Sequence, residues 1–239
     1  MAEGCDFNYL EQFYEFSNSR YKDRDFSRRR LDFLEKKISS YIQKKNPSIL
    51  DIGVGSGYLL DKLSDRYPEG RIWGLDLAWG ALKHIIVNLR RKNIFCVQAS
   101  SGFLPFRDGY FDAITASQVL EHLDSDRLDL TLGEARRVLI RGGYLFVTSP
   151  YSEDLTARQI KCPYCAKLFH PYGHLQSFDE ESWKNLAGRH GFELVKVKKI
   201  FTIDFPLGKL RHLKPLLLFG GRLLSLKPLI KIFVVMVKN

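Results

Sequence analysis

A glycine-rich loop is the first group of residues in this 239-residue sequence whose types and spacing could serve chemistry. It reads Asp51-Ile-Gly53-Val-Gly55-Ser-Gly57 and ends the apolar run "PSILDIGVG". The glycines occupy every second position, whereas the dinucleotide fingerprint GxGxxG requires a glycine at position 58, which is Tyr58. The spacing therefore argues against NAD.

A carboxylate follows the loop at a fixed distance. Asp76 ends the apolar stretch "GRIWGLDL", 25 residues after Asp51. An acid at the carboxyl end of a parallel strand can accept hydrogen bonds from both hydroxyls of a ribose. Loop and acid together indicate an adenosine-containing ligand, and they do not require a pyrophosphate.

The second chemical group is the stretch "KCPYCAKLFHPYGH" at residues 161–174. Its cysteines and histidines, Cys162, Cys165, His170 and His174, have the spacing of a tetrahedral Cys₂His₂ zinc site. Four protein ligands make such a zinc structural, whereas a site without His174 keeps a position for an acceptor thiol or hydroxyl. A lone CxxC is equally compatible with thiols that bind no metal, so both interpretations stay open.

The segments that must position these residues alternate between strand and helix patterns. Strands separated by helices of ten to nineteen residues are typical of βαβ units, which build a parallel sheet with helices on both faces. Predicted strands lie at 47–55, 70–77, 93–100, 110–120, 142–151, 193–203 and 229–237. Predicted helices lie at 57–67, 79–92, 121–139, 177–192 and 208–226.

Four motifs in register resemble the class I S-adenosylmethionine-dependent methyltransferases. They are "ILDIGVGSG", "GLDL", "LPFRDGYFDAITASQVLEHL" and "RVLIRGGYLFVTSP", which cover residues 46–150, and "SFDEESWKNLAGRHGF" extends the likeness. The resemblance implies an α/β fold, a Rossmann-like sandwich with a mostly parallel seven-stranded sheet and helices on both faces. It also implies S-adenosylmethionine as the cofactor.

The resemblance assigns cofactor contacts to individual positions. The methionine part of the cofactor falls to the glycine loop, at Asp51, Gly53, Gly55 and Gly57. Asp76 is assigned to the ribose diol and Leu77 to one side of the adenine. The family usually has an aspartate for the adenine amino group where this sequence has Ser100. A serine accepts only a weaker, neutral hydrogen bond, so adenine recognition is expected to depend more on backbone groups and Phe103.

Candidate catalytic residues lie near the ends of the later strands. Methyl transfer from a sulfonium mainly requires alignment and exclusion of water, and a base is needed only for a hydroxyl or an acidic carbon. Glu121 and His122 in "VLEHL" and His174 in "GHLQSF" are the candidates. Glu121 and His122 can instead simply cap and orient the start of a helix, and His174 can be a pocket residue, a zinc ligand or a surface residue.

Charge and composition divide the chain into parts. We expect an N-terminal helical extension at 1–45 and a methyltransferase domain at 46–239, with an insertion at 151–178 that binds zinc if the Cys₂His₂ interpretation holds. A basic helix and the last strand occupy 205–239, which carry seven basic residues and no acid within a net charge of +10. These cations suit an anionic membrane or simply a solvated helix face.

The predicted function is methylation of a small or lipid-linked acceptor at oxygen or carbon. The absence of a signal-peptide pattern and of a disulfide framework predicts a cytoplasmic location, with peripheral membrane contact through the basic C-terminus as an option. The alternative is a zinc-containing nucleic-acid-binding protein or an RNA methyltransferase on the same fold. Nucleic acid is disfavoured because the cations lie in the terminal segments and are not interleaved with aromatics.

Overall fold

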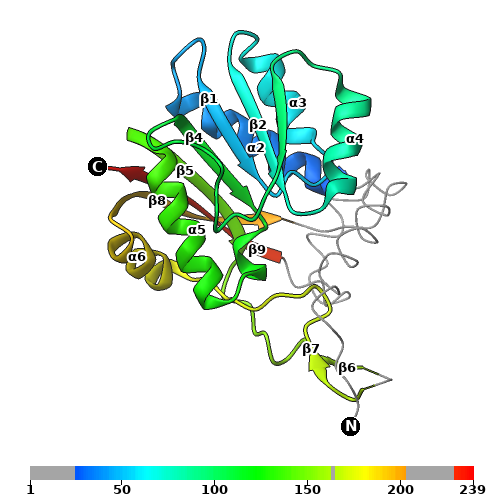
Figure 1. Cartoon of the computed structure of the whole chain (residues 1–239). Coiled ribbons are helices and arrows are strands. Elements are labelled where there is room, and N and C mark those ends of the chain that lie inside the picture. Colours follow the sequence, from blue (N-terminus) through cyan, green and yellow to red (C-terminus); the bar gives the residue numbers. More distant parts are fainter. Residues whose placement is uncertain (1–24, 163–164, 203–228) are drawn as a thin grey trace, which may run out of the picture.

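A seven-stranded sheet forms the centre of the computed structural model, which describes residues 25–162, 165–202 and 229–239 (Figure 1). The strand order is β3-β2-β1-β4-β5-β9-β8. The parallel strands are β1 (Ser48–Ile52), β2 (Arg71–Asp76), β3 (Ile94–Gln98), β4 (Phe111–Ser117) and β5 (Leu139–Pro150). The strand β9 (Leu229–Lys238) runs antiparallel to β5 and to β8 (Phe192–Thr202). The predicted mostly parallel seven-stranded sheet is confirmed.

Helices cover both faces of this sheet, as predicted. They are α2 (Asp25–Tyr41), α3 (Tyr58–Arg66), α4 (Trp79–Leu89), α5 (Ser125–Val138) and α6 (Glu180–Arg189). In β9, Phe233 and Val235 pack into the apolar cluster of α2, α3 and α4. Ile232, Val234 and Met236 pack into the cluster of α5 and α6. Successive side chains of β9 thus point to opposite faces of the sheet, and both faces are buried. This explains why the sequence of the strand is an almost continuous apolar run.

One predicted helix begins later than its sequence pattern suggested. The pattern placed a single helix at 121–139, but Leu120–His122 form a short 3₁₀ turn and α5 begins at Ser125. The reason is the side chain of Asp124, which caps α5 by accepting a hydrogen bond from the backbone N–H of Arg127 at 2.8 Å. Glu121 and His122 therefore lie in the turn between β4 and α5, outside the helix that they were predicted to start.

The two basic ends of the chain are only partly described. The helix α2 belongs to the predicted N-terminal extension and packs into the same core as β1, because Leu34 and Ile38 are fully buried beside Ile49. The predicted basic helix at 208–226 lies outside the described residues. No helix within the described ranges is long and apolar enough to cross a membrane.

The predicted insertion contains a small hairpin that extends away from the main sheet (Figure 1). Its strands are β6 (Ile160–Lys161) and β7 (Leu168–Phe169), which pair antiparallel. The turn is closed by hydrogen bonds from Cys162 N to Lys167 O at 2.8 Å and from Ala166 N to Cys162 O at 3.0 Å. The insertion returns to the core at Phe178, which forms a parallel bridge with Tyr151 at the end of β5.

Candidate active site

The glycine loop lies where the strand order of the sheet reverses, between β1 and β4. Ligands of open α/β sheets bind in this position, outside the carboxyl ends of the strands. Gly53, Gly55 and Gly57 all have positive φ angles, of 76°, 51° and 76°. A Cβ on Gly53 would lie 2.4 Å from a methyl group of Val119, whereas a Cβ on Gly55 would meet nothing within 4 Å. Gly53 is thus required by packing, and Gly55 leaves an open space beside the loop.

Two carboxylates, Asp51 and Asp76, lie at this edge on adjacent strands. Burial raises the pKa of Asp51 to about 7, and the nearby Asp76 adds to the rise, while a hydrogen bond donated by Thr115 opposes it. Burial also raises the pKa of Asp76, against the effect of backbone N–H groups that include that of Ala78, at 2.9 Å from Oδ1. Two neighbouring carboxyl groups that are largely shielded from water favour a cationic ligand, because a positive charge would lower the free-energy cost of ionising both.

Replacing Thr115 with valine should test the support of Asp51. Valine keeps the shape but removes the donor, so the buried carboxylate loses its hydrogen bond, at an expected cost of about 1–3 kcal/mol in the free energy of unfolding. Chemical denaturation measures the change. Thr131→Val is the matched control, because Thr131 shares its hydrogen bond with the neutral hydroxyl of Ser101 at 2.8 Å. An equal loss in the two variants at pH 8 would argue against a charged Asp51.

The predicted adenine-side residues lie at the ends of β2 and β3. Leu77 follows β2 and is 55% exposed, and Phe103 is 71% exposed. The exposed Ser100 lies in the same turn as Phe103, since its carbonyl accepts the Phe103 N–H at 3.1 Å. Exposed apolar surface beside a polar loop is typical of a site that a flat ligand covers.

A second set of predicted residues meets beside the ends of β4 and β5. Ligand-capable atoms of Glu121, His122 and His174 all lie within 4.8 Å of one another. The backbone carbonyl of Glu121 accepts the N–H groups of Leu175 at 2.7 Å and Gln176 at 3.0 Å. These bonds attach the end of the insertion to the turn after β4, so Glu121 and His122 form one cluster with His174, which lies 53 residues after Glu121 in the sequence.

Burial governs the charge of this cluster. It raises the pKa of Glu121, which has no exposed surface, to about 7, although its own backbone N–H and, to a lesser degree, His174, Lys231 and Arg30 act in the opposite direction. Burial, with the nearby His174, lowers the pKa of His122 to about 4. His122 is therefore neutral at physiological pH, and Glu121 is poised between its two states, as a group that exchanges protons requires.

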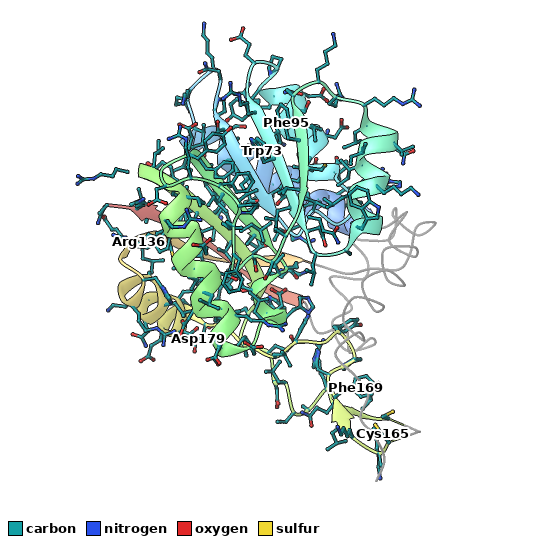
Figure 2. All side chains as sticks on the ribbon, viewed as in Figure 1. Trp73, Phe95, Arg136, Cys165, Phe169 and Asp179 are labelled. Atoms are coloured by element: carbon teal, nitrogen blue, oxygen red, sulfur yellow. The ribbon has the colours of Figure 1, made fainter. Side chains whose placement is uncertain are left out.

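The structure separates the predicted zinc ligands into two pairs. His170 and His174 stack with ring centroids 4.6 Å apart, close to the sheet. Cys162 lies opposite Lys167 in the hairpin. Lys167 precedes His170 by three residues, which corresponds to about 10 Å along a strand, so the cysteine lies that much farther from the sheet than His170. Figure 2 shows Cys165 on the same outlying hairpin. Among the described residues, neither group able to hold a metal ion includes a cysteine.

One site residue, Glu153, was not anticipated from the sequence. Its carboxylate lies 2.5 Å from His174 Nδ1 and 3.5 Å from His170 Nε2, and Arg158 approaches the same carboxylate at 3.2 Å. Glu153 lies three residues after the end of β5, in "SPYSED". An acid just after the fifth parallel strand, at the edge that carries Asp76 and Glu121, is the signal that could have identified it.

Comparisons with known proteins agree with this geometry. A family model described as "Methyltransferase domain" matches residues 20–197. A malonyl-[acyl-carrier protein] O-methyltransferase of Geobacter sulfurreducens is 35% identical over 155 residues, covering 62% of this chain and 57% of that protein. The ubiquinone/menaquinone biosynthesis C-methyltransferase UbiE of Serratia proteamaculans is 36% identical over 152 residues, covering 60% and 59%.

A solved structure shares the fold. The crystal structure of a SAM-dependent methyltransferase from Methanosarcina mazei matches with a TM-score of 0.62 at 17% identity, covering 84% of this chain and 96% of that one. At this identity the match supports the fold alone. The matched regions span less than two thirds of the length of either curated relative.

Proposed function

Because the chain belongs to the methyltransferase-domain family of class I S-adenosylmethionine-dependent enzymes, we propose that it transfers a methyl group from S-adenosylmethionine to a small or lipid-linked acceptor. The observation that carries the proposal is the pair of Asp51 and Asp76 beside a glycine loop with open space over Gly55. A cofactor with a cationic sulfonium and a ribose diol fits both acids.

The catalytic part of the proposal concerns the residues that face the acceptor. Glu121, His122 and His174 lie together past the ends of β4 and β5, on the side of the edge away from β2 and Asp76. A methyl group held over the glycine loop would point along the edge toward them. We assign the binding and deprotonation of the acceptor to these three side chains, the acceptor cluster. In-line alignment with the methyl group supplies most of the rate acceleration.

The nature of the acceptor follows from the relatives only as a proposal. One relative is named for O-methylation of a malonyl group on acyl-carrier protein and another for C-methylation in quinone biosynthesis. Oxygen and acidic-carbon acceptors both need a proton acceptor, and Glu121 offers one. The rival function, nucleic-acid binding or RNA methylation, has no support in these relatives.

Calorimetric titration with S-adenosylhomocysteine tests the proposal directly. We expect saturable binding at one site per chain, followed by methyl transfer from S-adenosylmethionine to malonyl thioester or demethylquinone acceptors in a radiometric assay. Absence of binding to either form of the cofactor would refute the proposed function. Tight RNA binding that weakens steeply with salt would support the rival.

Gly55→Ala should separate cofactor contact from backbone strain. The alanine methyl group fits the ligand-free protein but would occupy the space that the cofactor approaches. A left-handed alanine costs about 1 kcal/mol in stability. Gly109→Ala is the matched control, because Gly109 has a similar φ of 58° and equally open surroundings away from the site. We expect both variants to lose stability alike but only Gly55→Ala to lose affinity for S-adenosylhomocysteine, by about tenfold.

Equal cofactor affinity in the Gly55→Ala and Gly109→Ala variants would show that the loop is not approached from this side. Chemical denaturation of both variants provides the stability comparison, and calorimetry provides the affinities.

Two finer features of the protein also remain proposals. We propose that Cys162 and Cys165 hold a structural zinc ion, with His170 as a further ligand. The sequence prediction completes this site with His174, which in the structure instead lies within ligand distance of Glu121 and His122. Metal analysis of the purified protein tests this, and less than about a tenth of an equivalent of zinc would refute it. Loss of bound zinc in Cys162→Ser would identify the thiols as ligands.

The second feature concerns the basic C-terminal segment and the location of the enzyme. We propose a cytoplasmic enzyme whose basic segment before β9, residues 205–228, contacts anionic membrane, which would bring it to a lipid-linked acceptor. Co-sedimentation with vesicles tests the contact. Binding that does not depend on the fraction of anionic lipid would refute it.

A further inference from the structure

The turn after β4 contains a buried carboxylate with unmet bonding capacity. Glu121 has no exposed surface, and neither of its carboxylate oxygens accepts a hydrogen bond from another residue that the structure describes. A buried acid without partners is costly, so such a group normally serves a ligand. Arg30 and Lys231 act on it electrostatically, but the Nζ of Lys231 donates to Gln118 Oε1 at 2.6 Å.

Two histidines beside Glu121 are held in the tautomer that a metal ion requires. The Nδ1 of His174 lies 2.5 Å from the carboxylate of Glu153, and the Nδ1 of His122 lies 3.3 Å from the carbonyl oxygen of Gly173. Each acceptor faces an Nδ1–H donor, so Nε2 is the ring atom of each histidine that can bind a metal ion. Metal-binding histidines are oriented in this way by carboxylates and backbone carbonyls in their surroundings.

The structure assigns a new site to these side chains: we propose that Glu121, His122 and His174 bind a divalent transition-metal ion. Their ligand-capable atoms already lie within 4.8 Å of one another. Ligands at about 2.1 Å from one ion are roughly 3.0–3.4 Å apart, so binding requires only a modest contraction of the cluster. Two imidazoles and one carboxylate suit Zn²⁺ or Fe²⁺.

A second group of potential ligands in the same region is less suitable. It contains Glu153, His170 and His174. The Nδ1 of His170 accepts the backbone N–H groups of Tyr172 at 3.4 Å and of His174 at 3.3 Å, so its neutral ring carries the proton on Nε2. Glu153 is already engaged by Arg158 and His174. These residues position His174 and are not themselves the first choice for the ion.

Three protein ligands leave coordination positions open on the metal ion. An open position beside the acceptor cluster would bind an anionic oxygen of the acceptor, such as a carboxylate, enolate or phenolate, and hold it toward the methyl group. This role rests on the proposed methyl transfer, whereas metal binding itself does not. With the ion bound, Glu121 acts as a ligand and no longer as the proton acceptor, and the ion favours the deprotonated acceptor by lowering the pKa of its oxygen. The acceptor class is thereby narrowed to molecules with an acidic oxygen at or next to the atom that is methylated.

Cobalt binding provides a test with a readout besides activity. Co²⁺ is added to the chelator-treated full-length chain and followed by calorimetry and by absorption spectroscopy, because Co²⁺ reports thiolate ligands through a sulfur-to-metal charge-transfer band. We expect the proposed site to bind one ion that gives no such band. Co²⁺ bound at the cysteines would be a separate ion, whose band the double variant Cys162→Ser, Cys165→Ser removes. Glu153→Gln should weaken Co²⁺ binding about tenfold by releasing His174, and Glu121→Gln and His174→Gln should weaken it more.

Matched controls decide between the alternatives. His190 pairs with Asp129 at 2.9 Å away from the cluster, so His190→Gln should bind Co²⁺ as the parent does. The double variant Cys162→Ser, Cys165→Ser should also bind it. Undiminished binding in Glu121→Gln, no binding to the parent, or loss of all Co²⁺ binding in the cysteine double variant would each overturn the inference.

The same samples separate this inference from the proposed function. S-adenosylhomocysteine affinity is measured in parallel for every variant and reports that the fold is intact. Cofactor binding without Co²⁺ binding would refute the metal site and leave the proposed function in place. Co²⁺ binding without cofactor binding would do the reverse.

Discussion

Replacing Asp76 with alanine is expected to weaken binding of S-adenosylhomocysteine about 100-fold. Asp76 is the last residue of β2, at the edge of the sheet proposed to bind the cofactor. The backbone N–H of Ala78 donates a hydrogen bond of 2.9 Å to its Oδ1 and holds the carboxylate in place. A ribose diol can donate two hydrogen bonds to this charged group, and hydrogen bonds to charged groups contribute about 1.5–3 kcal/mol each. A total loss of about 3 kcal/mol corresponds to the 100-fold change, which calorimetry measures directly.

Asp76→Asn is the graded comparison for this experiment. The amide keeps the shape and one acceptor oxygen but loses the charge, so we expect a loss between those of the parent and the alanine variant. Asp112→Ala is the matched control: Asp112 lies at the start of β4, where it accepts from Lys44 and from the Ser48 N–H at 2.8 Å. An alanine variant at position 76 that binds like the parent would mean that the ribose lies elsewhere.

The sheet, and the meeting of the glycine loop and Asp76 at one of its edges, could be predicted because their signals are local. Strand residues such as Ile232 and Phe233 alternate between two cores, so a short apolar run bounded by turns is sufficient to identify the strand. The spacing from the glycine loop to Asp76 is set by one βαβ unit, which a single sequence displays in full. The start of α5 was misplaced because Asp124 resembles any other polar residue until its side chain is seen to cap the helix.

The acceptor cluster could not be fully predicted because it depends on contacts between distant segments. Glu153 meets His174 across 21 residues of an irregular insertion, and Lys231 meets Gln118 across 113 residues. The motif from Cys162 to His174 suggested one four-ligand site from spacing alone. The register of the hairpin instead directs the cysteines and the histidines to opposite ends, and register depends on pairing that the motif does not encode.

Replacing Asp51 with asparagine is expected to stabilise the protein at alkaline pH while weakening cofactor binding. The pKa of Asp51 rises from 3.8 to about 7 in the folded state, chiefly through burial. One pKa unit corresponds to ~1.4 kcal/mol, so the ionised side chain costs the fold up to about 4 kcal/mol. Asparagine is neutral at every pH and can still accept the hydrogen bond from Thr115.

The sign of this effect depends on pH in a defined way. Below the unfolded value of 3.8 the carboxyl group is protonated in both states, so Asp51 and asparagine should give similar stability. As pH rises from 3.8 through about 7, the unfolded chain releases its proton first, and the parent loses stability that Asp51→Asn retains. Denaturation at pH 4 should show almost the same free energy of unfolding for the parent and for Asp51→Asn. At pH 8 the variant should be more stable by up to about 4 kcal/mol.

Asp112→Asn is the comparison that tests whether the surroundings of the carboxylate determine the sign of the stability change. Asp112 is also largely buried, but Lys44 lies 3.0 Å away and the Ser48 N–H donates to it. Removing that charge should destabilise the protein, which is opposite in sign to the effect at Asp51. If Asp51→Asn were destabilising at pH 8 as well, the burial of Asp51 would not be the dominant contribution. We expect Asp51→Asn to gain stability and to lose affinity for the cofactor. The loss should be greater for S-adenosylmethionine than for S-adenosylhomocysteine, because only the former carries the sulfonium charge. Both results together would show that the protein keeps a destabilising carboxylate in order to bind the cofactor.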